Sequence, residues 1–184
     1  MTRSPTLRVL QLIGDTDVLD AHLAALALHR GLVEHGIEVR TLALSPGRRG
    51  GLEQDVPAIA PNRWSLAARG QVRAESKWAD VVVVHAPRAL TLATLAPRRG
   101  PSPPVVVAFW ESPVGPTSSR HSVARRIVAG AAAIVVADTE SAAAVAEHHG
   151  RSEGRRVIAA DLDDPGRPRP DAATWAQMLR EVAP

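Results

Sequence analysis

Side chains that could hold or react with a ligand stand directly after several apolar runs of the sequence, among them the valines of VVVAFWESPVG. In chain order these candidates are Gly14, Asp15, His85, Arg88, Trp110, Glu111, Ser112, Asp138 and Thr139. Histidine and glutamate can orient hydroxyl groups or exchange protons. An indole can stack on a ring but cannot relay a proton. These residue types therefore suit a site for a polar ligand, provided that the fold brings them together.

Strand and helix signals alternate along the chain. Strands are expected where short apolar runs end at a turn, and helices where apolar residues recur every three or four positions. The expected strands cover residues 7–13, 38–44, 80–85, 104–110, 132–137 and 156–160. The expected helices cover residues 21–35, 64–78, 89–96, 118–129, 139–148 and 171–182. This alternation predicts an α/β fold with a single doubly wound, mostly parallel Rossmann-like sheet flanked by helices.

The topology of such a sheet gives the candidate residues a common place. Ligands bind beyond the carboxyl ends of parallel strands, at the point where the strand order reverses. Every candidate ends or follows an expected strand, so we expect them at that edge. Each also has a plainer interpretation: His85 as a hydrogen-bonded structural residue, Trp110 as a cap on the core, and Glu111 as a solvated carboxylate.

Composition limits the function classes. The 184 residues suit one domain, and the single Phe and absent Tyr mean that small aliphatic side chains must fill the core. The absence of cysteine excludes disulfides and thiolate metal sites. No apolar stretch is long enough to span a membrane and none near the start resembles a signal peptide, so we expect a cytoplasmic protein. The formal net charge is only +3, and the scattered arginines lack interleaved aromatics, which argues against nucleic-acid binding.

Metal and cofactor sites have no recognisable pattern in the sequence. The aspartates near residue 17 lack the spacing of an EF-hand. His22, His29 and His35 are separated by seven and six positions, whereas two metal ligands on one helix need three or four, so we expect these histidines to face solvent. No G-x-S-x-G, P-loop or G-x-G-x-x-G motif occurs. We therefore expect neither a metal nor a cofactor.

Six segments of the chain form a recognisable series. In order they read RVLQLIG, HRGLVEHGIEVRTLAL, ADVVVVHAPRAL, PPVVVAFWESPVG, AAAIVVADTESAAAVAE and RVIAADLD. The series resembles the N-terminal half of a family-4 retaining glycosyltransferase of the GT-B fold. In that family this half binds the acceptor, and a second Rossmann-like half holds the nucleotide sugar. The resemblance implies a GT-B N-terminal-type domain at residues 1–164, a linker at 165–170 and, at 171–184, a crossover helix that packs back on the domain.

The resemblance also implies roles for the candidates. His85 matches a family histidine, and His85 and Glu111 would orient the hydroxyl groups of a sugar or glycoside acceptor. Arg88 would bind an acidic group of the acceptor, and Trp110 would stack on a ring. Backbone amides of the first turn would face the diphosphate of the donor. The remaining substrate-binding candidates are Gly14, Asp15, Ser112, Asp138 and Thr139.

Three features depart from the family pattern. The first strand is followed by Asp17-Val18-Leu19-Asp20 instead of a glycine-rich turn, and the bulk and negative charge of these residues oppose a phosphate. Trp110 stands where the family usually has a histidine. The chain also reads as if the donor domain were missing between the linker and the last helix. We therefore expect a degenerate, truncated acceptor-side half that is not catalytically competent alone and acts with a partner glycosyltransferase chain or as a homo-oligomer.

Two other interpretations remain open. A stand-alone small-molecule binder or enzyme would use the cleft at the strand ends, and would require the candidates after the third and fourth strands to converge. A non-catalytic interaction or scaffold protein would fill that cleft with its own side chains. The partner-dependent interpretation instead requires an exposed apolar surface, for which Trp64, Trp78 and Trp175 are candidate contacts.

Overall fold

Six strands form one parallel sheet. The computed structural model describes residues 6–17, 20–49, 51–52, 54–62, 65–85, 103–109, 132–136, 156–159 and 171–184. The strands are β1 (Arg8–Ile13), β2 (Glu38–Ala43), β3 (Val81–His85), β4 (Val105–Phe109), β5 (Ala133–Val136) and β6 (Arg156–Ala159). They lie in the order β2-β1-β3-β4-β5-β6, and every neighbouring pair is parallel. The doubly wound parallel sheet predicted from the sequence is confirmed.

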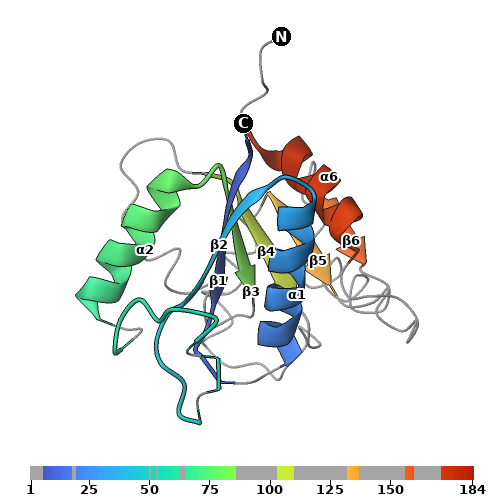
Figure 1. Cartoon of the computed structure of the whole chain (residues 1–184). Helices are drawn as coiled ribbons and strands as arrows, with labels where there is room; N and C mark the ends of the chain where they lie inside the picture. Colours follow the sequence, from blue (N-terminus) through green and yellow to red (C-terminus); the bar gives the residue numbers. More distant parts are fainter. Residues whose placement is uncertain are drawn as a thin grey trace, which may run out of the picture.

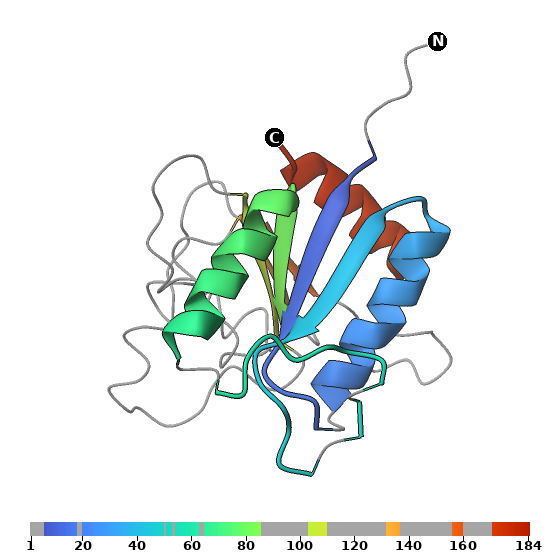
Figure 2. The same cartoon turned by 60° about the vertical axis from the view of Figure 1, so that its left-hand side comes forward.

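Helices cover both faces of the sheet. The helices α1 (Asp20–Glu34) and α6 (Ala172–Val182) lie on one face, and α2 (Leu66–Trp78) lies on the other (Figure 1, Figure 2). The predicted helices at 89–96, 118–129 and 139–148 and the linker at 165–170 lie outside the described residues. In the described part of the chain, no helix is both long enough and apolar enough to cross a membrane.

The boundaries of these elements follow from local chemistry. All five side chains of β3 are buried, as expected for a strand that is covered on both faces. Gly36 has a φ of 74° and ends α1, because a left-handed residue after a helix favours glycine. Ser65 and Asp171 begin α2 and α6, each accepting a hydrogen bond from a backbone N–H of the first turn.

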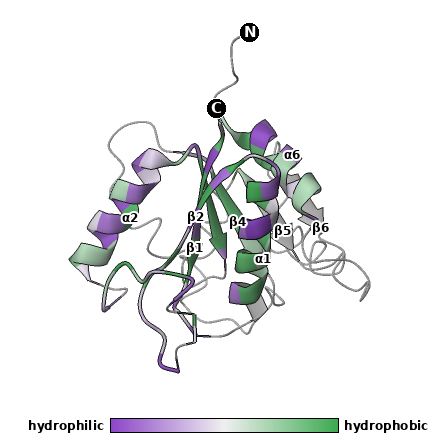
Figure 3. Cartoon of the chain, viewed as in Figure 1, coloured by the Kyte–Doolittle hydropathy of each residue, from purple (hydrophilic) through white to green (hydrophobic). Residues whose placement is uncertain are grey.

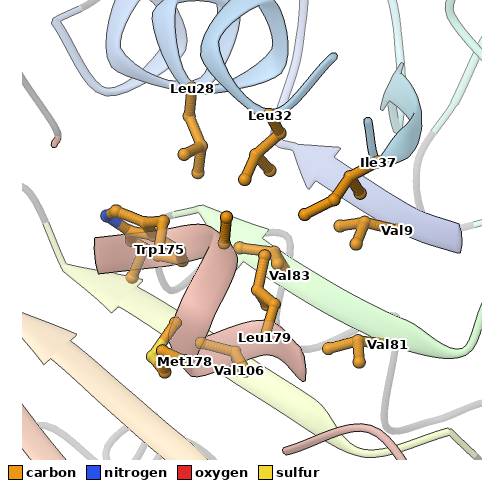
Figure 4. Close-up of a cluster of buried hydrophobic side chains, with 12 residues drawn as sticks. Val9, Leu28, Leu32, Ile37, Val81, Val83, Val106, Trp175, Met178 and Leu179 are labelled. Atoms are coloured by element: carbon orange, nitrogen blue, oxygen red, sulfur yellow. The ribbon is translucent and has the colours of Figure 1, made fainter. Parts of the chain in front are cut away.

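One apolar core lies between the sheet and the α1–α6 pair. Leu28 and Leu32 of α1 point toward Trp175 of α6 and toward valines of the sheet (Figure 4). The two helices touch at Gly31, where a Cβ atom would lie 2.4 Å from the Cβ of Ala172. Trp175 is only 3% exposed, so the prediction that it contacts a partner is wrong. The helix turns its apolar face inward because that face packs against α1 and the valines of the sheet.

A second apolar core lies between the sheet and α2. Its strand residues alternate with those of the first core, and β4 is coloured as hydrophobic in Figure 3. Trp78 at the end of α2 packs against this core and is half-buried. Its ring is covered by the guanidinium of Arg40, which lies 4.0 Å from the ring centroid. One face of the Trp78 ring is therefore covered by Arg40, and Trp64 lies outside the described residues.

Candidate functional site

The switch point of the sheet lies between β1 and β3. The chain passes from β1 outward to β2 and then returns to the other side of β1 as β3, so the two connections leave in opposite directions. Gly14 and Asp15 follow β1, and His85 ends β3, so the structure brings these three predicted residues to one edge. The other predicted site residues lie outside the described residues: Arg88, Trp110, Glu111, Ser112, Asp138 and Thr139.

His85 is fully buried at this edge and joins β3 to β1. Its Nε2 lies 2.6 Å from Oε1 of Gln11, which is also buried. Burial, with a smaller contribution from the nearby His22, lowers the pKa of His85 to about 3. The imidazole is therefore neutral near pH 7, and its Nε2–H donates to the Gln11 carbonyl oxygen. Nε2 of Gln11 is buried without a hydrogen-bond partner in the described part of the chain.

His22, near the beginning of α1, lies above this pair. It is 2% exposed, and its Nδ1 lies 2.6 Å from the backbone oxygen of Asp17. The same nitrogen lies 3.9 Å from Oδ1 of Asp15. The prediction that His22 faces solvent is therefore wrong. Its side chain is buried because the loop between β1 and α1 folds back and supplies a carbonyl oxygen for the ring.

The other two histidines of this segment differ from each other. His29 is half-buried, with its Nδ1 2.9 Å from Oγ1 of Thr41 on β2. Burial, with a smaller contribution from the charge of Arg30, lowers its pKa. The prediction of a solvent-facing side chain is thus wrong for His29 as well, whereas His35 is exposed as expected. A spacing of seven residues is two helical turns, so His22 and His29 share the face of α1 that meets the sheet.

The loop between β1 and α1 is held by the loop that follows β2. Oγ1 of Thr16 accepts a hydrogen bond of 2.8 Å from the backbone N–H of Gly47. Oδ1 of Asp17 accepts one of 2.7 Å from the backbone N–H of Arg49. The N–H of Leu52 donates to the backbone oxygen of Thr16 at 3.2 Å. The two loops therefore form one bonded layer over the carboxyl ends of β1 and β2 (Figure 1).

The chemistry of this layer disfavours a phosphate at the end of β1. Asp15 accepts a hydrogen bond from the N–H of Asp17, and Asp17 accepts one from Arg49. Two backbone donors are thus already bound to carboxylates, whose negative charge also repels an anion. Within the described residues, no group of three or more histidine or acidic side chains could hold a metal ion.

The arrangement of the sheet matches known structures. No protein-family model and no curated protein sequence matches the chain. The chain is similar to HepE (Alr3699) of Anabaena, solved in complex with UDP and glucose, with a TM-score of 0.54 and 18% identity over 83% of this chain and 44% of that one. It is also similar to MurG of Acinetobacter baumannii, with a TM-score of 0.58 and 16% identity over 87% of this chain and 47% of that one.

The fold is GT-B-like. At these identities the similarity concerns the fold, that of glycosyltransferases such as HepE and MurG. The chain spans less than half the length of either structure. The GT-B-like Rossmann fold that the sequence resemblance implied is confirmed. Three of the predicted site residues, Gly14, Asp15 and His85, lie at the switch point of this fold.

Proposed function

We propose that this protein is a glycosyltransferase-like, family-4-related acceptor-side domain that works with a partner chain supplying the nucleotide-sugar site. The observation that carries the proposal is the GT-B-like fold shared with HepE and MurG. HepE was solved with UDP and glucose, which is the ligand chemistry that we extend to the proposed complex. In it, this chain binds a sugar or glycoside acceptor.

The first loop is the reason for assigning the donor to another chain. A donor diphosphate needs free backbone N–H groups or cations, and it is repelled by carboxylates. At the end of β1, Asp15 and Asp17 provide carboxylates, and each accepts a backbone N–H. The proposed complex therefore holds the diphosphate on the partner, away from this loop.

The proposed roles of the site residues come from the family resemblance, and the structure adds the burial of His85. His85 is buried and neutral, so in this proposal it positions the edge of the sheet and the acceptor hydroxyl groups near it, without moving a proton. Glu111 orients the acceptor hydroxyl, Arg88 binds an acidic group, and Trp110 stacks on a ring. Ser112, Asp138, Thr139, Gly14 and Asp15 complete the acceptor side.

Depletion and add-back in native cell extract test the proposal. The chain is removed with an antibody, transfer of radiolabelled sugar from nucleotide donors is measured, and purified chain is then added back. We expect depletion to lower the transfer to one endogenous acceptor and the wild-type chain to restore it. The chain alone should transfer none, because the donor site is on the partner.

Variants make this experiment specific to the site. Glu111→Gln should fail to restore transfer, and His85→Gln should restore it only in part. Glu34→Gln, an exposed carboxylate at the opposite end of α1, serves as the matched control and should restore it fully. Restoration by the Glu111→Gln and His85→Gln double variant equal to that of the wild type would contradict the proposed site. Unchanged transfer after depletion would contradict the proposed function.

A further inference from the structure

The loop after β2 carries two arginines at the carboxyl edge of the sheet. We call residues 45–49 the arginine loop, after Arg48 and Arg49. In Figure 3 the tip of this loop is hydrophilic and projects beyond the strand ends. Through its hydrogen bonds to residues 16 and 17, the loop lies beside the end of β1, which is one side of the switch point. The two arginines are thus near the proposed acceptor site.

The backbone of the arginine loop is fixed in place. Gly47 donates to Thr16 and packs so closely on Asp17 that a Cβ atom at this position would lie 2.2 Å from the Asp17 Oδ1 and 2.5 Å from its backbone nitrogen. Contacts this short exclude every residue except glycine. Arg49 donates its own N–H to the same carboxylate oxygen at 2.7 Å. The two arginines therefore extend from a backbone whose position is set before any ligand binds.

The guanidinium groups at the tip are not used by the fold. Both side chains are exposed, and neither makes an ion pair or a side-chain hydrogen bond in the described part of the chain. Two other arginines of the domain form ion pairs, Arg8 with Asp80 at 2.9 Å and Arg40 with Glu75 at 3.1 Å. The nearest loop carboxylate, that of Asp17, binds the backbone of the arginine loop. Two uncompensated positive charges therefore stand on a fixed backbone.

We propose that the arginine loop binds the acidic group of a small ligand, a phosphate or a carboxylate, at the carboxyl edge of the sheet. Guanidinium groups form paired, charge-assisted hydrogen bonds with both kinds of oxyanion. Because the backbone is already ordered, binding restricts only the two side chains. The identification of this group as the acidic group of the acceptor rests on the proposed function. The binding of an anion by the arginine loop does not depend on a partner chain.

Calorimetric titration of the isolated chain at low ionic strength tests the site. The probes are glucose 6-phosphate, glucuronate and neutral glucose, so that the first two separate a phosphate ligand from a carboxylate ligand. The wild type should bind at least one acidic sugar and bind glucose more weakly. Arg48→Gln with Arg49→Gln should weaken this binding about tenfold or more, since hydrogen bonds to a charged group are lost. Raising the salt should weaken it as well.

A second double variant controls for net charge. Arg30→Gln with Arg73→Gln removes two exposed arginines from α1 and α2 that also have no ion pair within the described residues. It should bind the acidic sugars within about twofold of the wild type, because a change of net charge alone is screened by salt. An equal loss in both double variants, or no binding of either acidic sugar by the folded wild type, would overturn the proposal. Binding without transfer in the add-back experiment would overturn only the proposed function.

Discussion

The two faces of the sheet are built differently. On the α2 face, the side chains of β1, β3 and β4 that enter the core are all apolar: Leu10, Leu12, Val82, Val84, Val105 and Val107. On the α1–α6 face, the strands are apolar toward their amino ends, but Gln11 and His85 are buried toward the carboxyl ends, beneath His22. Among the core side chains of the described part of β1, β3 and β4, the polar ones therefore lie on one face, near the switch point.

This difference indicates which face of the sheet mainly stabilises the fold and which one carries the candidate site. A buried polar pair contributes less than apolar residues of the same volume unless every polar atom is bonded. Nε2 of Gln11 has no partner within the described residues, so this buried N–H group destabilises the α1–α6 face. Polar groups kept in an interior at such a cost are typical of a site whose geometry matters. On α2, Nε of Arg69 is also buried without a partner within the described residues, but the core side chains of that face are all apolar and serve as the scaffold.

The largest effect is expected from removing the anchor of α6. Trp175→Ala should lower the free energy of unfolding by about 3–5 kcal/mol, because it leaves a cavity in the apolar core between the sheet and the α1–α6 pair. Chemical denaturation monitored by circular dichroism measures the loss. Gln177→Ala, on the exposed side of the same helix, is the control and should change stability by less than about 0.5 kcal/mol. Similar losses in the two variants would mean that α6 is not docked as described.

The next effect is a pH dependence of stability, to which the polar end makes the largest contribution. The pKa of His85 is about 3 in the folded chain and about 6.5 unfolded, so the unfolded state binds more protons between these values and stability falls as the pH is lowered through this range. From pH 7 to pH 4 this group should lower the free energy of unfolding by about 3 kcal/mol. Denaturant titrations at each pH measure it.

His85→Leu should remove most of this dependence. His29 contributes in the same direction, because its pKa is also lowered, so a smaller slope should persist in the variant. His35→Gln is the control, since that side chain is exposed. A pH profile unchanged by His85→Leu would show that the buried, neutral imidazole described for the wild type is wrong.

A smaller effect is expected from changing the partner of His85. Gln11→Met leaves Nε2 of His85 without this acceptor and should destabilise the chain by about 1–2 kcal/mol. Combining it with His85→Leu replaces both members of the buried pair by apolar side chains and should recover most of that loss, as measured in a double-mutant cycle. Additive losses in the cycle would mean that the two side chains do not depend on each other.

The elements of the fold could be predicted from the sequence because their signals are local. The uniformly apolar VVVV could only suit a strand covered on both faces, and Gly36 marks the end of α1 at the predicted place. Each described strand begins and ends within one residue of its predicted bounds. The carboxyl-edge location of Gly14, Asp15 and His85 follows from the same topology rule.

The contacts within the site could not be predicted, because they join residues far apart in the sequence. Gln11 and His85 are 74 positions apart, and Arg49 reaches Asp17 across 32. The spacing of the histidines excludes a metal site on one helix, but it does not by itself indicate exposure, because His22 and His29 lie two turns apart on one face of α1. That face of α1 also carries the buried Leu32, so the apolar periodicity of the helix indicates that the two histidines face the sheet.

Titration of the isolated chain with UDP and UDP-glucose tests the central claim that the donor site lies on another chain. We expect no binding in the micromolar range, with a folded chain confirmed on the same sample by size and circular dichroism. The Arg48→Gln, Arg49→Gln variant is titrated in parallel, so that weak contacts of the diphosphate with the arginine loop are recognised. Micromolar binding that persists in this variant would show that the chain holds a donor by itself, and would contradict the account.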